Sequence, residues 1–187
     1  MNFFDDEKNV EDYVKMAEGY DGRALIDILR KYLNNEAAVL ELGMGPGKDF
    51  EILSESFQVT GSDNAQAFLD RYHAINPAAD LVLLDAVKMD IERKFDCIYS
   101  NKVLQHLTKE ELRESLKRQW GILNNNGILL HSLWYGDKEE EFSGLRFVYY
   151  TEETLGEIVG PDYEIVETKR YTELEPDDSL YILLRKG

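Results

Sequence analysis

A glycine-rich segment around residue 45 constrains the fold of this chain more than any other feature. Residues 39–42 form a short apolar run typical of a strand, and a helix is expected from Lys48. Between them lie Gly43, Gly45 and Gly47, which permit a tight turn and let a ligand approach the backbone without a Cβ in the way. The amino terminus of the following helix offers unpaired N–H groups to a carboxylate or phosphate. The segment therefore predicts a strand, a ligand-binding loop and a helix in succession.

Short apolar runs alternate with longer mixed-charge stretches as far as residue 134, which is the pattern of repeated βα units. The expected strands are 39–42, 57–61, 81–84, 95–99 and 127–134. Helices are expected from Lys48, over 64–73 and over 109–120. The continuous apolar character of 81–84 is typical of a strand covered on both faces, so we expect a parallel sheet between two helical layers.

The two ends of the chain follow other patterns. Residues 10–33 have helical spacing, and the glycines at 19 and 22 are expected to divide them into two helices. A short helix is expected from the N-cap Thr151 to Val159, followed by strands 163–171 and 180–185, which have no room for a crossover helix and should pair antiparallel. The predicted fold class is α/β, with a doubly wound, mostly parallel seven-stranded sheet, an antiparallel C-terminal edge hairpin and an N-terminal helical cap.

Charge and cysteine content exclude several classes of partner and site. The chain has 37 Asp plus Glu against 21 Lys plus Arg, a formal net charge of −16, which repels phosphate backbones and anionic membrane surfaces. Cys97 is the only cysteine, so an intramolecular disulfide and a Cys-rich zinc site are excluded. The acidic first residues do not have the order of a secretory signal, and no apolar run approaches the ~20 residues that span a bilayer. We expect a cytoplasmic monomer or homodimer without nucleic-acid, membrane or metal partners.

Two ligand classes use a glycine loop of this kind. A dinucleotide fingerprint requires glycines at its first, third and sixth positions. The sixth position counted from Gly43 is Lys48, where close packing of helix on strand requires a small residue. The glycines here stand at the first, third and fifth positions, with Glu41 two residues ahead. This departure counts against a nicotinamide or flavin cofactor.

The loop resembles the first motif of the class I S-adenosylmethionine-dependent methyltransferases, which runs acid-x-Gly-x-Gly-x-Gly. Glu41 and the three glycines match that motif position by position. Further segments similar to the family's motifs follow in the family's order, at residues 83–86, 95–101, 103–107 and 127–130. The third of these is common in the small-molecule branches. The resemblance implies one methyltransferase domain over residues 1–187, with a helical cap over 1–35 and a Rossmann-like core over 36–187.

The resemblance also implies a cofactor, S-adenosylmethionine, and roles for the residues that bind it. In the family, an acid at the position of Asp63 binds both ribose hydroxyls, and Asp85 or the amide of Ala86 would read the adenine edge. Asn101 would contact the methionine part through its backbone, and Tyr20 would contribute an aromatic ring from the cap. The expected cofactor-binding residues are Tyr20, Glu41, Gly43, Gly45, Gly47, Asp63, Asn64, Asp85, Ala86 and Asn101.

Physical reasoning about the two aspartates leaves alternatives open. Asp63 lies 20 residues after Gly43, close to the spacing of a ribose-binding acid, and one carboxylate can accept from two adjacent hydroxyls. The alternative is that Asp63 caps the helix expected over 64–73. Asp85 could accept from the exocyclic amine of adenine or could be a solvated loop acid.

The catalytic requirement is modest. Methyl transfer from a sulfonium is an in-line displacement that needs alignment and the exclusion of water, and a base is required only if the acceptor must lose a proton. His106 is the candidate for such a base, the alternative being a packing or capping role. No other residue is assigned to catalysis.

Acceptor-binding residues are expected after the strand 127–134. Trp134, Tyr135 and Tyr149 could line a pocket for an apolar or cationic acceptor, or could seal the strand to the next helix. Arg146 could hold an anionic substrate or pair with the neighbouring glutamates.

The expected function is the transfer of a methyl group from S-adenosylmethionine to a small-molecule acceptor. Residues 100–103 depart from the Asn/Asp-Pro-Pro-aromatic motif of amino-directed nucleic-acid and protein methyltransferases. Two alternatives remain open at this point, namely a catalytically silent S-adenosylmethionine-binding partner subunit and a nucleotide-dependent oxidoreductase.

Overall fold

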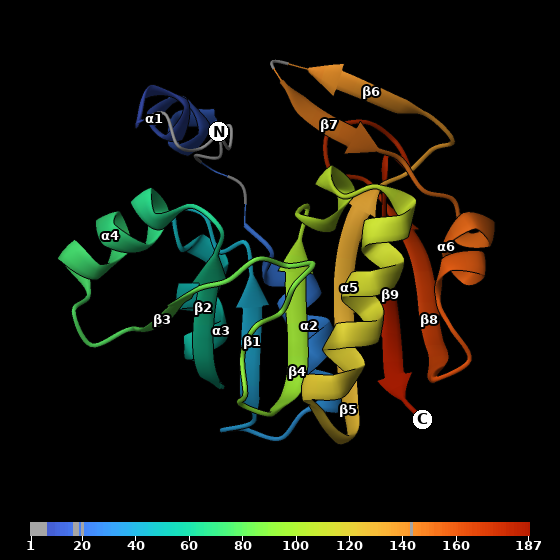
Figure 1. Ribbon diagram of the computed structural model, residues 1–187, viewed down its shortest axis with the longest axis horizontal. Helices are drawn as coiled ribbons and strands as arrows, with labels where there is room; N and C mark the ends of the chain where they lie inside the picture. Colours follow the sequence, from blue (N-terminus) through green and yellow to red (C-terminus); the bar gives the residue numbers. More distant parts are fainter. Residues whose placement is uncertain (1–6, 17–18, 20, 143) are drawn as a thin grey trace.

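A mixed seven-stranded sheet forms the centre of the computed structural model, which describes residues 7–16, 19, 21–142 and 144–187 (Figure 1). The strand order is β3-β2-β1-β4-β5-β9-β8. The strands are β1 (Ala38–Leu42), β2 (Gln58–Asp63), β3 (Asp80–Leu83), β4 (Phe95–Asn101), β5 (Leu123–Trp134), β8 (Tyr163–Tyr171) and β9 (Ser179–Lys186). β9 pairs antiparallel with both β5 and β8, and the other pairings are parallel. The predicted doubly wound sheet and its C-terminal hairpin are confirmed.

The helices cover both faces of this sheet. They are α1 (Glu7–Met16), α2 (Arg23–Tyr32), α3 (Lys48–Ser54), α4 (Gln66–Ile75), α5 (Lys109–Ile122) and α6 (Glu152–Ile158), with a 3₁₀ turn η2 (Leu104–His106). Successive strand residues point to opposite faces. Val39 and its register partner Cys97 pack with α2 and α3, whereas the next pair, Leu40 and Ile98, packs with α5 and α6.

The two N-terminal helices have different surroundings. Leu25, Ile26 and Leu29 of α2 are buried in the same cluster as the central strands, so α2 is a layer helix of the sheet. Only α1 has the position expected of a cap, beyond the carboxyl ends of the parallel strands (Figure 1). Val10 of α1 packs there against Phe68 of α4. The division into a cap over 1–35 and a core over 36–187 stays a prediction.

A second, two-stranded sheet was not expected from the sequence. β6 (Glu139–Phe142) and β7 (Leu145–Val148) pair antiparallel across a turn in which Gly144 has φ +82°. Glycine adopts such a left-handed conformation without steric cost, which allows the tight reversal. Figure 1 shows this hairpin beyond the carboxyl end of β5, at the same end of the sheet as α1.

A buried histidine links the sheet to α5. Nδ1 of His131 lies 2.8 Å from Ser100 Oγ, and Nε2 lies 2.8 Å from Gln119 Oε1. Because Gln119 Oε1 only accepts, Nε2 carries the proton and Nδ1 accepts from Ser100. Burial lowers the pKa of His131 to about 3, so the ring stays neutral in the folded protein.

Replacing His131 by Gln will therefore change how stability depends on pH. The unfolded chain binds a proton at His131 below about pH 6.5 and the folded protein does not, so the free energy of unfolding falls as the pH falls, by about 1.4 kcal/mol per pH unit. His131→Gln removes this contribution. Urea unfolding of both proteins between pH 6.5 and 4 tests the prediction, and parallel pH profiles would contradict it.

Candidate functional site

A cavity of about 350 Å³ lies at the carboxyl ends of β1 to β4. Its wall is formed by the residues that follow these four strands, together with Tyr13 of α1 and Leu145 and Arg146 of β7. The strand order reverses here, because β2 lies on one side of β1 and β4 lies on the other. Ligands of open α/β sheets bind at such a switch point.

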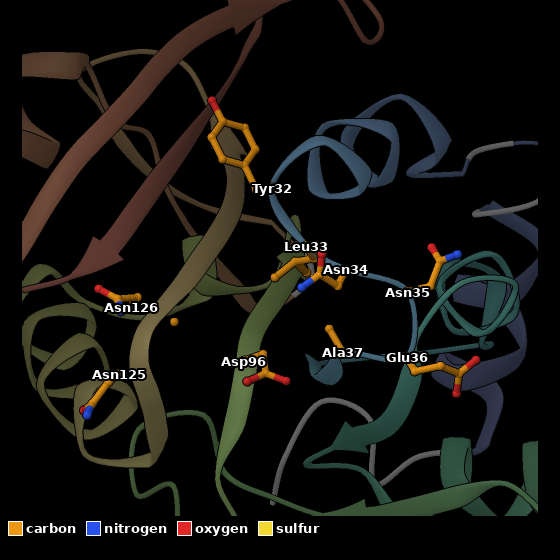
Figure 2. Close-up of a pocket in the computed structure, with 10 residues that line it drawn as sticks. Tyr32, Leu33, Asn34, Asn35, Glu36, Ala37, Asp96, Asn125 and Asn126 are labelled. Atoms are coloured by element: carbon orange, nitrogen blue, oxygen red, sulfur yellow. The ribbon is translucent and has the colours of Figure 1, made fainter.

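A second hollow, of about 300 Å³, lies at the opposite end of the sheet. Figure 2 shows that it is lined by the segment before β1, from Tyr32 to Ala37, and by Asn125 and Asn126 in the first part of β5. The half-buried carboxylate of Asp96 in this hollow already accepts hydrogen bonds from the amide of Ala38 at 2.9 Å and from Asn124 Nδ2 at 2.7 Å. The structure therefore places the functional candidate at the first cavity.

The glycine loop packs so tightly that two of its positions exclude a side chain. Gly43 and Gly47 have φ values of +65° and +89°, and a Cβ on either would lie 2.6 Å from Val103 or 2.4 Å from the ring of Tyr72. Gly45 also has a positive φ, +49°, but a Cβ there would meet nothing closer than Tyr13 Cε1 at 3.5 Å. The loop is thus closed on its protein side and open toward the cavity at Gly45.

Asp63 holds this loop against the end of β2. Its Oδ2 accepts from the amide of Gly45 at 2.9 Å, and its Oδ1 accepts from the amide of Ala65 at 2.9 Å. Burial raises the pKa of Asp63, and the hydrogen bonds from Ala65 and Gly45 partly oppose that rise. The N-cap of α4 is Ala65, without a side-chain capping bond, so Asp63 is not the cap of this helix. Asp63 and Asn64 both line the cavity.

Glu41 is buried on β1 just ahead of the loop, with 3% of its surface exposed, and it is not one of the residues that line the cavity. Its Oε2 has no hydrogen-bond partner among the described residues. Burial raises the pKa of Glu41 well above its usual value, and the nearby charges of Asp49 and Asp63 raise it further. A buried carboxylate oxygen without a partner is costly, so this position favours a ligand that brings a positive charge or a donor.

Asp49 connects three parts of the site and was missed as a functional residue. It accepts from the amide of Gly22 at 2.6 Å, from Tyr99 Oη at 2.7 Å and from Asn101 Nδ2 at 3.0 Å. The other end of the Asn101 amide accepts from Ser132 Oγ. The Asn101 side chain is thus fully engaged with protein, as expected of a residue that would use its backbone toward a ligand. The acid in the first turn after the glycine loop was the available signal for Asp49.

Asp85 and Ala86 lie in the cavity wall after β3. Asp85 Oδ1 accepts from the amides of Val87 and Lys88 at 2.8 and 3.1 Å, which shapes the loop. Because the residue is exposed and only one of its oxygens is used, the carboxylate can still accept from a ligand. The prediction for Asp85 and its alternative are both compatible with this geometry.

Lys102 is a second residue that sequence reasoning missed. Its ammonium lies 3.1 Å from Glu173, 2.6 Å from Ser179 Oγ and 3.7 Å from the centre of the Trp134 ring. Burial lowers the pKa of Lys102 to about 8, although Glu173 favours the charged form. The side chain therefore fastens the end of β4 to β5, β9 and the loop before β9.

His106 and Arg146 meet at the rim of the cavity. Nδ1 of His106 lies 2.7 Å from the carbonyl oxygen of Arg146, so Nδ1 carries the proton and Nε2 has the free lone pair. The edge of Phe147 packs on the His106 ring at 4.8 Å. Burial lowers the pKa of His106, which keeps the ring neutral near pH 7. The geometry permits a role as base and also gives His106 a packing role.

Several expected residues lie away from the cavity wall. The face of Trp134 is covered by Lys102, and Tyr135 lies under the guanidinium of Arg170 at 3.8 Å. Tyr149 Oη donates to Glu140 Oε1 at 2.5 Å. Their assignment to acceptor binding stays a prediction. Tyr20 is outside the described residues.

Tyr13 is the aromatic residue of the cap that does line the cavity. It packs edge-on against Phe68 with 5.8 Å between ring centres. Burial raises the pKa of Tyr13, and Asp63 and Asp49 raise it further, so the hydroxyl faces the acidic side of the site. The segment around Tyr13 was expected to cover the cofactor, but this residue was not singled out.

Among the residues that the structure describes, no group of three or more His, Cys, Asp or Glu is arranged to hold a metal ion. No helix in the described ranges is long and apolar enough to cross a membrane.

Comparisons with known proteins connect this geometry to a family. Residues 39–127 match the model of a family described as "Methyltransferase domain". The trans-aconitate 2-methyltransferase of Methylobacterium radiotolerans is 34% identical over 93 residues, 48% of this chain and 35% of that enzyme. The enzyme of the same name from Variovorax paradoxus is 31% identical over 118 residues, 61% of this chain and 44% of that enzyme. The chain thus spans less than half the length of either curated relative.

Solved structures share the whole fold. An S-adenosylmethionine-dependent methyltransferase from Clostridium acetobutylicum aligns with a TM-score of 0.75 at 14% identity, covering 100% of both chains. The 1,6-didemethyltoxoflavin-N1-methyltransferase of Burkholderia thailandensis aligns with a TM-score of 0.77 at 21% identity, covering 95% of this chain and 86% of that one. The chain therefore has the fold of these methyltransferases over its whole length, and residues 39–127, slightly less than half of it, match the family model.

Proposed function

We propose that this chain transfers a methyl group from S-adenosylmethionine to a small-molecule acceptor. The observation that carries the proposal is the buried, unpartnered Oε2 of Glu41 just ahead of the glycine loop. An amino group is the complement that this oxygen lacks, and the methionine part of the cofactor carries one. The residues present therefore fit the cofactor.

The remaining cofactor contacts are proposed for residues that line the cavity and for Gly47 and Asn101, which do not line it. Asp63 uses each oxygen once, toward Gly45 and Ala65, and retains lone pairs for the two ribose hydroxyls. Asp85 and Ala86 would bind the adenine edge, and Asn101 would face the methionine part through its backbone. Gly43, Gly45 and Gly47 leave room for the backbone to approach the ligand. When bound, the cofactor supplies a methyl group attached to a sulfonium sulfur, and after transfer of the methyl group that sulfur is part of a thioether.

The chain itself supplies alignment and shields the reaction from water. Tyr13 covers the open side of the loop at Gly45, and Asp49 holds the end of β4 through Asn101. Alignment of this kind can remove several kcal/mol from a displacement barrier without any acid or base. A general base is needed only for an acceptor with a proton to lose, and His106 is the residue placed to serve then.

The acceptor is proposed to be a small molecule. The net charge of −16 disfavours nucleic acid. Trans-aconitate is the first compound to test, because both curated relatives are named for it. A silent cofactor-binding subunit and a nucleotide-dependent oxidoreductase are the rival functions.

Calorimetric titration separates the rival cofactors. S-adenosylhomocysteine is expected to bind with micromolar affinity and NAD⁺ not to bind, because Lys48 stands where a dinucleotide fingerprint needs a small residue. Binding of NAD⁺ alone would sink the proposal. Incubation with methyl-labelled S-adenosylmethionine and trans-aconitate or other small acceptors then tests for turnover, and binding without any turnover would favour the silent subunit.

Asp63→Asn is expected to weaken the binding of S-adenosylhomocysteine by about 1.5–3 kcal/mol, roughly 10- to 150-fold, which is the scale of hydrogen bonds to a charged group. Asp80→Asn is the matched control, because Asp80 stands on the neighbouring strand β3, outside the cavity lining, and pairs with Arg93 at 2.7 Å. Calorimetry and thermal unfolding of both variants distinguish the roles. Equal affinity for all three proteins would remove Asp63 from the binding site.

Glu41→Gln is expected to remove a pH dependence of cofactor binding. In the free protein the pKa of Glu41 is raised, and an amino group bound beside it favours the charged form, so affinity should rise with pH between 5 and 8. The glutamine variant should lose this slope and bind roughly tenfold or more weakly at pH 8. Glu51→Gln, at an exposed position of α3, should behave like the unmodified protein. An unchanged slope in Glu41→Gln would show that another group titrates.

A further inference from the structure

A lysine and an arginine, Lys102 and Arg146, line the cavity within the described part of the chain. The ammonium of Lys102 is already paired with Glu173 and Ser179, and Trp134 covers it. Arg146 is different. The only ion-pair contact of its guanidinium with another described residue is 3.9 Å from Nη1 to Glu111 Oε2, which is longer than a hydrogen bond.

Glu111 is a poor partner for Arg146 because the same oxygen is already in use. Glu111 Oε2 accepts from the amide of Thr108 at 2.8 Å, and Thr108 Oγ1 accepts from the amide of Glu111 at 3.1 Å. This capping box holds the Glu111 carboxylate at the start of α5. The donors of the Arg146 guanidinium are therefore available at the cavity rim, where half of the side chain is exposed.

The backbone of Arg146 is nevertheless firmly placed. It pairs with Glu141 across the β6–β7 hairpin, and its carbonyl oxygen accepts from His106 Nδ1 at 2.7 Å. Phe147, the next residue, packs edge-on against the same imidazole. A rigid hairpin thus presents a loosely engaged guanidinium to the cavity. Such preorganisation favours ligand binding because little order is lost when the ligand arrives.

We propose that Arg146 binds a carboxylate of the methyl acceptor, and that the acceptor is a di- or tricarboxylate. The inference rests on the proposed function and names the substrate class of the same cavity. The planar guanidinium matches a carboxylate in a two-point contact, which an ammonium cannot make. Leu107 and Leu145 in the cavity wall can contact the carbon chain between the carboxylates.

A second carboxylate is proposed because the one paired with Arg146 shares its negative charge with the guanidinium, which makes it the weaker nucleophile. The free carboxylate is the nucleophile, and one of its oxygen lone pairs forms the new O–CH₃ bond. The electron pair of the broken S–CH₃ bond returns to sulfur, so the products are a methyl ester and S-adenosylhomocysteine. No proton is transferred in this step. This agrees with a site in which His106 donates a hydrogen bond from Nδ1 to the backbone carbonyl of Arg146 and stays neutral.

The long-range field of the acidic protein does not decide against an anionic acceptor. At physiological ionic strength, interactions between exposed charges are screened beyond about 8 Å. A direct contact with Arg146 acts at much shorter range. The rival interpretation is structural, in that Arg146 and Glu111 attach the hairpin to α5.

Calorimetry on the protein loaded with S-adenosylhomocysteine tests the proposal without requiring turnover. Succinate and tricarballylate are expected to bind, whereas succinamide and 1,4-diaminobutane, which have similar length but no carboxylate, are not. Arg146→Gln should weaken the binding of the carboxylates tenfold or more and leave the affinity for S-adenosylhomocysteine unchanged. Arg146→Lys should have an intermediate affinity for the carboxylates. Arg118→Gln is the matched control, because Arg118 is equally exposed and pairs with Glu114 on the outside of α5.

Glu111→Gln separates binding from hairpin attachment. Glutamine can keep the capping box and removes the competing charge, so carboxylate affinity should be retained or increased. If Arg146 only attaches the hairpin, Glu111→Gln and Arg146→Gln should have the same effect. That equality, preferential binding of the diamine, or unchanged affinity in Arg146→Gln would overturn the proposal.

Turnover supplies an independent readout. Methyl-labelled S-adenosylmethionine with di- and tricarboxylates should give products that release methanol in alkali, as esters do, and Arg146→Gln should raise KM more than it lowers kcat. Label that is stable to alkali on an amine would contradict the inference while supporting the methyltransferase function. Failure of S-adenosylhomocysteine to bind at all would be a failure of the proposed function, and the inference would fall with it.

Discussion

The site depends on two hydrogen bonds from backbone amides to the carboxylate of Asp63. One comes from Gly45 in the glycine loop and the other from Ala65 before α4. They join the turn after β1 to the turn after β2, and so fix the distance between the two walls of the cavity. A neutral or longer side chain could not hold both turns with one planar group, because the two acceptor oxygens must diverge from a single short stem.

The site has opposite charges at its two ends. Asp63 lines the cavity at the end of β2, with Glu41 of β1 and Asp49 of α3 near it, whereas Lys102 and Arg146 line the cavity after β4 and on β7. Burying carboxylates at the acidic end costs free energy, and the three carboxylates differ in the hydrogen bonds that offset this cost. Asp49 accepts from three donors, Asp63 accepts from two amides, and Glu41 keeps one oxygen without a partner. A cationic sulfonium cofactor beside an anionic acceptor complements this arrangement.

The sequence could predict the parts of the site that are local. The glycine loop, the acid ahead of it and Asp63 are separated by short, regular distances along two adjacent βα units, and strand pairing brings them together. The contacts of Asp49 with Gly22 and Asn101 could not be predicted in this way, because they join α3 to segments 27 and 52 residues away. Trp134 illustrates the same limit. Its place after β5 suggested a pocket wall, but the register of β5 and β9 places the Lys102 ammonium on its ring.

The β6–β7 hairpin shows how this fold divides its two tasks along the chain. The residues proposed to hold the cofactor, from Glu41 to Asn101, lie within the 39–127 segment that matches the family model. Arg146 and the rest of the hairpin lie outside that segment, and they reach the cavity only because η2 docks on β7 through His106. The hairpin is anchored by Val148 of β7, which is buried in the main core, and by the contacts of Arg146 and Phe147 with His106, none of which involves the glycine loop. The segment that matches the family model therefore contains the residues proposed to hold the methyl donor, and the hairpin contains Arg146, the residue proposed to bind the acceptor.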